Sequence, residues 1–396
     1  MAVIGVVGEF NPFHLGHLRH IEASRQRLGA DTPVVCVMSG DFVQRGAPAA
    51  FDKHARAEAA ARCGADLVFE LPLPWCLASA ERFAMGAVGL LDSLRVVTHL
   101  SFGSESGDLA PLTALALAAS EPDSIRLIRE RMGGGMSFAA AREAVLHETV
   151  GPQARLLEKP NNTLGVEYLK ALFALCSDMI PMTTLRSETE HDAMSGGPAR
   201  SASQLRSMLE AGEDISPYVP EAIRRMPREL MDGGRGPVTM ENLETAILSR
   251  LRRLGPSDLA ALPDATEGLD NRLFRAVRSE ESVDAVLSAV KTKRYPLSRL
   301  RRMVMCAALG VTTGMGGDRP GYARLLASTA RGRTLLRQIS GQFPVITKPA
   351  AAKELSPAAA EVFRVTADAR DFYVLGYPVI GERKGGSDWR ASPATL

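Results

Sequence analysis

Two histidines, His14 and His17, stand three residues apart where an apolar stretch turns into a helical pattern, within Val3–His20. At this spacing on a helix the two imidazoles face the same way. The unpaired amides of a first helical turn and the positive end of the helix dipole favour an anion there. Gly16 lies between them and allows a ligand to approach the backbone. The pattern predicts a triphosphate site in which the histidines stabilise charge during attack on the α-phosphate.

A His-x-x-His spacing also occurs in metal-binding pairs and on solvated surfaces, because short motifs recur by chance. No cysteine or acidic cluster at ligand spacing accompanies the pair, which disfavours zinc, and we expect no metal held by the protein alone. The position directly after the first apolar stretch favours the phosphate interpretation.

Further polar groups follow later strands. Arg186 ends a short strand pattern, and Ser201 opens a helical one with Arg206 about one turn on. A hydroxyl and an arginine at a helix start can form a second phosphate cradle. The alternative is a serine N-cap with a surface arginine.

The adjacent amides Asn161 and Asn162 precede another helical stretch and can read the edge of an adenine or ribose. Helix capping by Asn162 is the competing interpretation. Arg45, in a loop of small residues, can bind a ligand or pair with an acid. Lys53 and Arg56, at a helix start with Asp52 as its expected N-cap, can face phosphate or solvent.

Alternating strand and helix patterns must position these groups. We expect strands at Ala2–Gly8, Pro33–Met38, Asp66–Leu71, Val96–Gly103 and Met182–Leu185, and helices near Gly16–Leu28, Asp52–Cys63, Leu77–Leu94 and Leu109–Ala118. This alternation predicts an α/β fold with a doubly wound parallel sheet. Such sheets bind ligands at the carboxyl ends of their strands, where the histidines and Ser101–Glu105 both fall.

Beyond about Pro217 helical periodicity dominates, including helices near Arg324–Ile339 and Ser356–Arg370. We therefore expect two domains, 1–216 with the ligand site and a mainly α-helical, basic second domain, 217–396.

The net charge of +2 hides an uneven distribution, because Lys291–Lys353 contains thirteen Lys or Arg residues and one acidic residue, Asp318. Such a region suits a polyanion. Arg299 and Arg302 share one helical face, and Tyr295 offers a ring for stacking an RNA base. A solvated basic face is the alternative. The candidate RNA-binding residues are Lys291, Lys293, Arg294, Tyr295, Arg299 and Arg302.

The composition excludes some classes of protein. Five scattered cysteines without a Cys-x-x-Cys pair indicate free thiols in a reducing compartment. The beginning of the chain does not resemble a signal peptide, and no apolar run reaches the length of a membrane span. We therefore expect a cytoplasmic protein with no membrane partner.

These motifs together resemble the tRNA(Met) cytidine acetate ligase family, within the HxGH nucleotidyltransferase superfamily. The ordered matches are GEFNPFHLGH, MSGDFVQRG, GADLVFELP, SAERFAMGAV, FGSESG, KPNNTLG, EGLDNR and KTKRYPLSRLRR. They extend over nearly the whole chain. The chain departs from the family at Ser203, where threonine is common, and at Glu190, which precedes His191 where an aromatic residue is expected.

The resemblance implies that acetate attacks ATP to give acetyl-adenylate and pyrophosphate. The wobble cytidine of elongator tRNA(Met) then takes the acetyl group to give N4-acetylcytidine and AMP. Mg²⁺ is expected with ATP, and the basic helical domain would hold the anticodon arm.

It also implies roles for individual residues. His14 and His17 would be catalytic, and Ser201 and Arg206 would contact the triphosphate. The other ATP-site residues would be Val7, Gly8, Glu9, Phe10, Asn11, Pro12, Phe13, Leu15, Gly16, His20, Gly103, one of Asn161 and Asn162, and Arg186.

Two other functions remain open at this point. A small-molecule adenylyltransferase would use the same histidines, but such enzymes are often shorter and do not need the basic region. A non-catalytic RNA-binding protein would bind ATP without turning it over.

Overall fold

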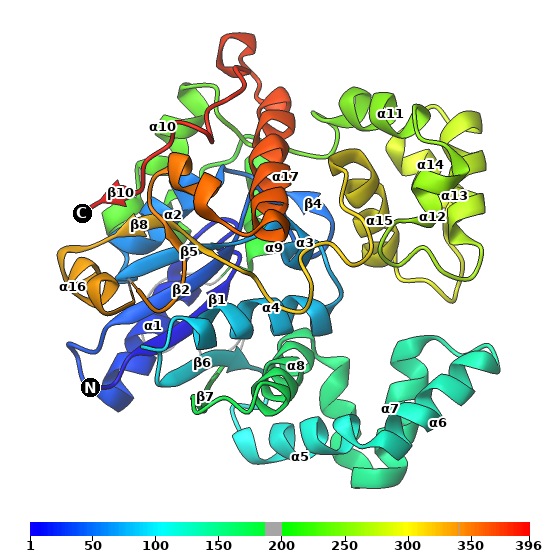
Figure 1. The fold of residues 1–396 in the computed structure, drawn as a ribbon, viewed down its shortest axis with the longest axis horizontal. Helices are drawn as coiled ribbons and strands as arrows, with labels where there is room; N and C mark the ends of the chain where they lie inside the picture. Colours follow the sequence, from blue (N-terminus) through cyan, green and yellow to red (C-terminus); the bar gives the residue numbers. More distant parts are fainter. Residues whose placement is uncertain (187–199, 340) are drawn as a thin grey trace.

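The computed structural model describes residues 1–186, 200–339 and 341–396 (Figure 1). At its centre is an eight-stranded sheet of order β10-β8-β5-β2-β1-β6-β7, with β9 paired to β8. The strands are β1 (Ile4–Gly8), β2 (Val34–Ser39), β5 (Leu67–Leu71), β6 (His99–Ser104), β7 (Ile180–Leu185), β8 (Ala323–Ser328), β9 (Val345–Ile346) and β10 (Ala394–Thr395). A separate small hairpin joins β3 (Phe42–Val43) and β4 (Ala47–Pro48).

The strands predicted from the first half of the chain all pair in parallel, β5 with β2, β2 with β1, β1 with β6 and β6 with β7. Neighbouring residues of β2 enter different cores: Val35 and Val37 pack on one face of the sheet, and Cys36 and Met38 on the other. A sheet buried on both faces explains why its strands read as continuous apolar runs. The predicted doubly wound α/β class is confirmed.

Helices cover both faces and extend beyond the sheet. In the first half they are α1 (Leu15–Leu28), α2 (Lys53–Arg62), α3 (Leu73–Cys76), α4 (Ala80–Ser93), α5 (Leu109–Ser120), α6 (Pro122–Gly133), α7 (Phe138–Val150) and α8 (Pro160–Ala174). In the second half they are α9 (Ala202–Glu210), α10 (Met226–Asp232), α11 (Glu244–Arg252), α12 (Pro256–Ala260), α13 (Leu269–Ser279), α14 (Val283–Val290), α15 (Leu297–Leu309), α16 (Ala330–Ile339) and α17 (Pro357–Tyr373). Figure 1 shows α11 to α15 gathered beside the sheet and α5 to α7 in a second group below them.

The predicted boundary between 216 and 217 does not coincide with a boundary of the sheet. Strands β8, β9 and β10 all come from 217–396 and join the strands of the first half, with β8 antiparallel to β5. The second half is therefore not a separate helical domain. Its helical character is concentrated in α11 to α15, which the chain inserts before it returns to the sheet.

The helix predicted over Arg324–Ile339 is wrong in its first part, because Ala323–Ser328 is strand β8 and α16 begins at Ala330. Every residue of β8 is buried. A strand whose six residues are all buried, Arg324 and Ser328 included, lacks the alternation that identifies a half-exposed strand, so periodicity alone does not separate it from a helix.

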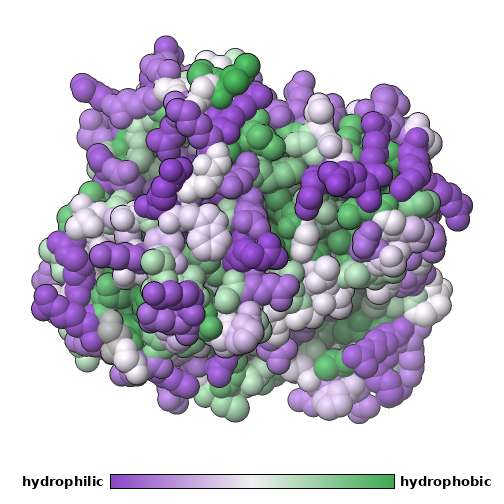
Figure 2. All heavy atoms as spheres, turned by 45° about the horizontal axis from the view of Figure 1, so that its top comes forward, coloured by the Kyte–Doolittle hydropathy of each residue, from purple (hydrophilic) through white to green (hydrophobic). Residues whose placement is uncertain are grey.

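Figure 2 shows hydrophilic side chains over much of one face, with smaller apolar areas between them. No helix of the described residues has the length and apolar character needed to cross a membrane.

Candidate active site

The candidate site lies at the carboxyl ends of β1, β6 and β7, beside the N-termini of α1 and α8. The loop after β1 leads directly into α1, and Arg186 follows β7. Because these strands are parallel neighbours, their ends meet at one edge of the sheet. The structure thus brings together three segments that are far apart in the sequence.

His14 and His17 form the beginning of α1. His14 is the N-cap, and its Nδ1 accepts a hydrogen bond from the Gly16 amide at 3.0 Å. His17 Nδ1 accepts from the His14 amide at 3.2 Å, and the two rings stack with their centroids 3.8 Å apart. A Cβ on residue 16 would lie 2.8 Å from His14 Cε1, so glycine makes the folded-back position of this ring possible.

These contacts fix the proton positions on the two imidazoles. Each Nδ1 accepts from a backbone N–H, so in the neutral ring the proton is on Nε2. Burial lowers the pKa of His17 well below 6.5, and the nearby His14 and Arg186 act in the same direction. His17 is therefore neutral at physiological pH, and its Nε2–H can donate to an anion.

His20 connects α1 to the strands. Its Nδ1 lies 2.7 Å from Thr184 Oγ1, and its Nε2 lies 3.3 Å from Ser101 Oγ. Burial lowers the pKa of His20 to about 4, and Arg186 contributes to the shift. With both nitrogens engaged by hydroxyls, His20 holds the helix in place against β6 and β7.

Aromatic packing supports the loop before α1. The buried rings of Phe10 and Phe13 lie 5.1 Å apart, and each lies within 5.3 Å of the His17 ring. Arg56, predicted to face phosphate or solvent, does neither. It is buried and donates to the backbone oxygens of Glu9 and Ser39. This buried arginine therefore joins the loop before α1 to the end of β2.

Gly103 and Arg186 lie against each other, as expected for residues of one site. A Cβ at Gly103 would be 2.5 Å from Arg186 Cδ, so the absence of a side chain makes room for the arginine stem. The Arg186 amide donates to the Ser104 oxygen at 2.8 Å, and Nη1 donates to Asn161 Oδ1 at 3.0 Å.

The structure assigns different contacts to the two adjacent asparagines. Asn162 is 1% exposed, and its side chain accepts from the Ser106 amide and donates to the Leu156 oxygen. It is therefore occupied within the protein, but it is not the N-cap of α8, which is Lys159. Asn161 faces Arg186 and is the asparagine placed to contact a ligand.

Ser201 and Arg206 have separate surroundings. Ser201 is the N-cap of α9, where its hydroxyl accepts from the Gln204 amide at 3.3 Å, so the capping alternative describes its contact. Arg206 reaches the loop after β1, and its Nη1 donates to the Asn11 oxygen at 2.8 Å. Burial lowers the pKa of Arg206, and the nearby Arg45 acts in the same direction. Cationic side chains from two segments thus approach the loop before α1.

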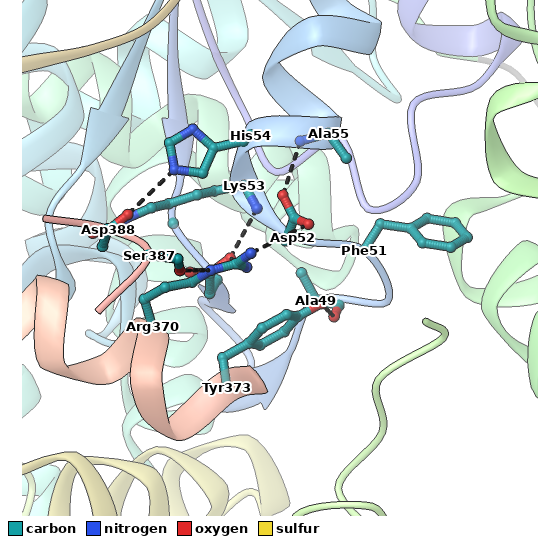
Figure 3. A network of polar contacts seen from close by, with 12 residues as sticks. Ala49, Phe51, Asp52, Lys53, His54, Ala55, Arg370, Tyr373, Ser387 and Asp388 are labelled. Atoms are coloured by element: carbon teal, nitrogen blue, oxygen red, sulfur yellow. Dashed lines mark hydrogen bonds and ion pairs between the residues drawn. The ribbon is translucent and has the colours of Figure 1, made fainter. Parts of the chain in front are cut away.

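A buried polar network joins the start of α2 to α17 and to Asp388 near the C-terminus (Figure 3). Lys53, which is 0% exposed, donates to Glu70 at 2.7 Å and to Asp388 at 2.8 Å. Asp388 also pairs with His54 and Arg324. The prediction that Lys53 faces phosphate or solvent is therefore wrong, because its charge is neutralised inside the protein.

The second part of the network surrounds Asp52, the predicted N-cap of α2, which accepts from the Ala55 amide at 3.0 Å. Arg235 and Arg370 pair with its other oxygen at 2.7 and 3.4 Å. Burial acts to raise the pKa of Asp52, but these cations outweigh it and the pKa is lowered. Arg370 also pairs with Asp41 at 3.2 Å and so joins α17 to the loop after β2.

Several of the candidate RNA-binding residues turn inwards. Tyr295 is 7% exposed, and its hydroxyl donates to Glu267 at 2.6 Å, so its ring is not open for stacking. Arg294 pairs with Glu267, and the buried Arg302 pairs with Asp264. Arg299 lies on the same face of α15 and donates to Asp264 and Thr266.

These four side chains therefore hold the loop before α13. A sequence window shows a cluster of cations but not the acids that meet it from elsewhere. Lys291 and Lys293 remain exposed.

The side chains that could bind a metal ion or act as a thiol nucleophile were also located. Within residues 1–186, 200–339 and 341–396, no group of three or more His, Cys, Asp or Glu side chains is placed to hold a metal ion. All five cysteines are free, and burial raises the pKa of Cys36, Cys76 and Cys306. Positions 190 and 191, where the chain departs from the family pattern, lie outside the described residues.

Three further residues support the site. Ser101 and Glu105 belong to the stretch expected at this edge of the sheet, but no role was predicted for either, and Thr184 was not predicted at all. Glu105 accepts from the amides of Asn161 and Asn162, and the two hydroxyls bind His20. Glu105 stands in the FGSESG motif, which was a signal for the site without indicating a role. Thr184 gave no signal, since a threonine in a strand is ordinary.

Comparisons with known proteins cover the whole molecule. The HIGH Nucleotidyl Transferase family matches residues 1–388. A protein of Acetivibrio thermocellus named tRNA(Met) cytidine acetate ligase is 36% identical over 412 residues, 98% of either chain. One of the same name from Caldanaerobacter subterraneus is 37% identical over 95% of this chain and 96% of its own. The crystal structure of Thermotoga maritima TmcAL bound with alpha-thio ATP superimposes with a TM-score of 0.92 at 32% identity and covers both chains fully.

Proposed function

The chain belongs to the HIGH nucleotidyl transferase family and, within it, to the tRNA(Met) cytidine acetate ligases, and from that premise we propose how its residues carry out the ligation. The protein is an ATP-dependent acetate ligase. Its substrates in our proposal are ATP, acetate and the wobble cytidine of elongator tRNA(Met), in the cytoplasm.

We propose a reaction in two steps. A carboxylate oxygen of acetate attacks the α-phosphorus of ATP, and the bond from this phosphorus to the bridging oxygen breaks to release pyrophosphate. The exocyclic amine of cytidine then attacks the acetyl carbon of the mixed anhydride, loses a proton and expels AMP. Carboxylate does not react with an aromatic amine unless it is activated, and a closed site protects the anhydride from water. No covalent bond to the enzyme is needed.

The residues at the start of α1 suit the first step. The Nε2–H groups of His14 and His17 provide donors, and the first turn of α1 adds the positive end of its dipole. Arg186 lies close enough to His17 to lower its pKa, and Arg206 donates to the Asn11 oxygen in the loop before α1, so two further segments add positive charge near the start of α1. Charge that develops on the α-phosphate and on pyrophosphate would be stabilised by donors that are already in place.

Mg²⁺ belongs to the proposal as the companion of ATP, where it neutralises phosphate charge. The described residues offer no cluster of carboxylates, so phosphate oxygens and water would provide most of its ligands. For tRNA, the exposed Lys291 and Lys293 are the members of the predicted basic set that remain available.

The observation that carries the proposal is the stacked pair His14 and His17, with both Nδ1 atoms held by backbone amides at the N-terminus of α1. The test is incubation with ATP, Mg²⁺, labelled acetate and an elongator tRNA(Met) transcript, followed by digestion and mass spectrometry. We expect labelled N4-acetylcytidine at the wobble position.

The other outcomes distinguish the alternatives. Acetate-dependent release of pyrophosphate without label on the RNA would retain the adenylation site and remove the assigned acceptor. Pyrophosphate release sustained by a small nucleotide-like substrate instead of tRNA would indicate a small-molecule adenylyltransferase. Binding of ATP and RNA without turnover would indicate a non-catalytic protein.

A further inference from the structure

Glu105 occupies a position between the strand that carries Gly103 and the helix that carries Asn161. Its Oε1 accepts from the Asn161 amide at 3.2 Å and from Asn161 Nδ2 at 2.7 Å, and its Oε2 accepts from the Asn162 amide at 2.8 Å. The carboxylate therefore caps α8 from outside that helix, where Lys159, the N-cap, makes no side-chain cap bond.

The same contact fixes which way the Asn161 amide points. A carboxylate only accepts hydrogen bonds, so the NH₂ group of Asn161 must face Glu105. The Oδ1 atom is then directed to Arg186, whose Nη1 donates to it at 3.0 Å. If the amide were reversed, an NH₂ group would confront the guanidinium, and both would be donors.

We propose that Glu105 is a positioning residue for ATP binding, which acts through Asn161 to orient the guanidinium of Arg186, whose stem crosses Gly103. This inference rests on the proposed function. The backbone of Arg186 is fixed by Ser104, and its stem passes over Gly103. Within the described part of the chain, the bond to Asn161 is the contact that orients the end of the side chain.

The sharpest variant is Glu105→Gln, because it keeps the size of the side chain and replaces one acceptor by a donor. Whichever way its amide turns, at least one of the three N–H groups around it meets another donor. Where Asn161 turns to compensate, its NH₂ group faces Arg186. We expect KM for ATP to rise roughly 10-fold, the size of effect expected for a hydrogen bond to a charged group, with kcat changed much less. Equilibrium binding of ATP should weaken by the same factor.

A double-mutant cycle tests the route through Asn161. Asn161→Ala alone should also raise KM for ATP, and Glu105→Gln added to it should cause little further change. Asp108→Ala is the matched control. Asp108 caps the neighbouring helix α5 through a single bond to the Ala110 amide at 3.0 Å, and its loss removes a carboxylate cap without reaching Arg186. Thermal unfolding of all variants monitors loss of the caps.

Three results would overturn the inference. A normal KM for ATP in Glu105→Gln with a raised one in Asn161→Ala would make Glu105 a helix cap only and would leave the proposed function intact. Equal increases in Glu105→Gln and Asp108→Ala would assign the effect to helix stability. Unchanged ATP binding in Asn161→Ala and Arg186→Met together would remove both residues from the ATP site, and the inference with them.

Discussion

Two groups of buried or partly buried cations, one in the polar network of α2 and α17 and one at the candidate site, differ in their partners. In the network of Figure 3, Lys53 and Arg370 each pair with two carboxylates and are buried. At the candidate site, the guanidinium groups of Arg186 and Arg206 each donate to a neutral oxygen, those of Asn161 and Asn11. Among the described residues neither forms an ion pair.

The difference indicates what each group is for. A buried charge that is fully paired contributes to holding segments together, and its removal leaves a partner unpaired. A cation held in place by neutral oxygens keeps its charge available for an anion that is yet to bind. Arg294 and Arg302 resemble the first group, because Glu267 and Asp264 meet them.

The largest effect should follow removal of a donor at the transition state. We expect His14→Ala to lower acetate-dependent pyrophosphate release by roughly 10² to 10³, the range found when one such donor is lost. Binding of tRNA should be nearly unchanged. His99→Gln, at the other end of β6, is a control histidine, and an equal loss of turnover in both variants would contradict the assignment.

Breaking the paired group should cost stability instead. Arg370→Met leaves Asp41 and part of Asp52 unpaired, and we expect the free energy of unfolding to fall by about 3–5 kcal/mol. Urea unfolding measures this change. The folded fraction should retain its KM for ATP. A raised KM without loss of stability would instead assign Arg370 to the ligand-binding group.

Arg186→Met should show the opposite behaviour. Among residues 1–186, 200–339 and 341–396 no carboxylate forms an ion pair with the Arg186 guanidinium, and Glu105 acts on it only from a distance. Stability should therefore change little, while KM for ATP should rise roughly 10-fold or more. The two arginine variants should be measured together for unfolding and for ATP binding. We expect Arg370→Met to change only the stability and Arg186→Met to change only the binding of ATP. Loss of stability in Arg186→Met would place this arginine with the structural group.

A smaller effect should appear as pH dependence. The pKa of His20 is about 4 in the folded protein against 6.5 in an unfolded chain, so between these values the unfolded state binds more protons. Stability should therefore fall as the pH decreases from 6.5 to 4. His20→Asn should remove part of this slope in urea titrations, with the remainder due to His17, and an unchanged slope would contradict the buried neutral state of His20.

The smallest effect concerns RNA. Replacement of Lys291 or Lys293 by Gln should weaken tRNA binding and reduce the dependence of log Kd on log salt by about one unit per lysine. The paired Arg302 is the comparison: its replacement should cost stability first. An unchanged salt slope in both lysine variants would move the RNA contact elsewhere.

The sequence predicted the features that depend on local spacing. His14, Gly16 and His17 lie within one turn, and their mutual contacts follow from the helix itself. The parallel strands were recognisable from their apolar runs and the helices between them. Gly103 and Arg186 came from the family resemblance, and the structure brings them together.

The predictions that were wrong concern residues whose partners lie far away in the sequence. Lys53 is buried because Asp388 reaches it, and Tyr295 is buried because Glu267 bonds its hydroxyl. Neither partner stands near its residue in the sequence. Strand β8 was mistaken for helix because its neighbour in the sheet, β5, lies in the first part of the chain.

The place of β8 also affects how the protein is made. Until the ribosome has synthesised the chain beyond Ala323, the outer edge of β5 has no strand beside it, although β1, β2 and β5 are complete much earlier. Translation adds roughly 5–20 residues per second, so the backbone groups at this edge of β5 remain unpaired for many seconds. An open strand edge invites pairing with other chains. The nascent protein should therefore depend on chaperones most strongly while its inserted helices are being translated.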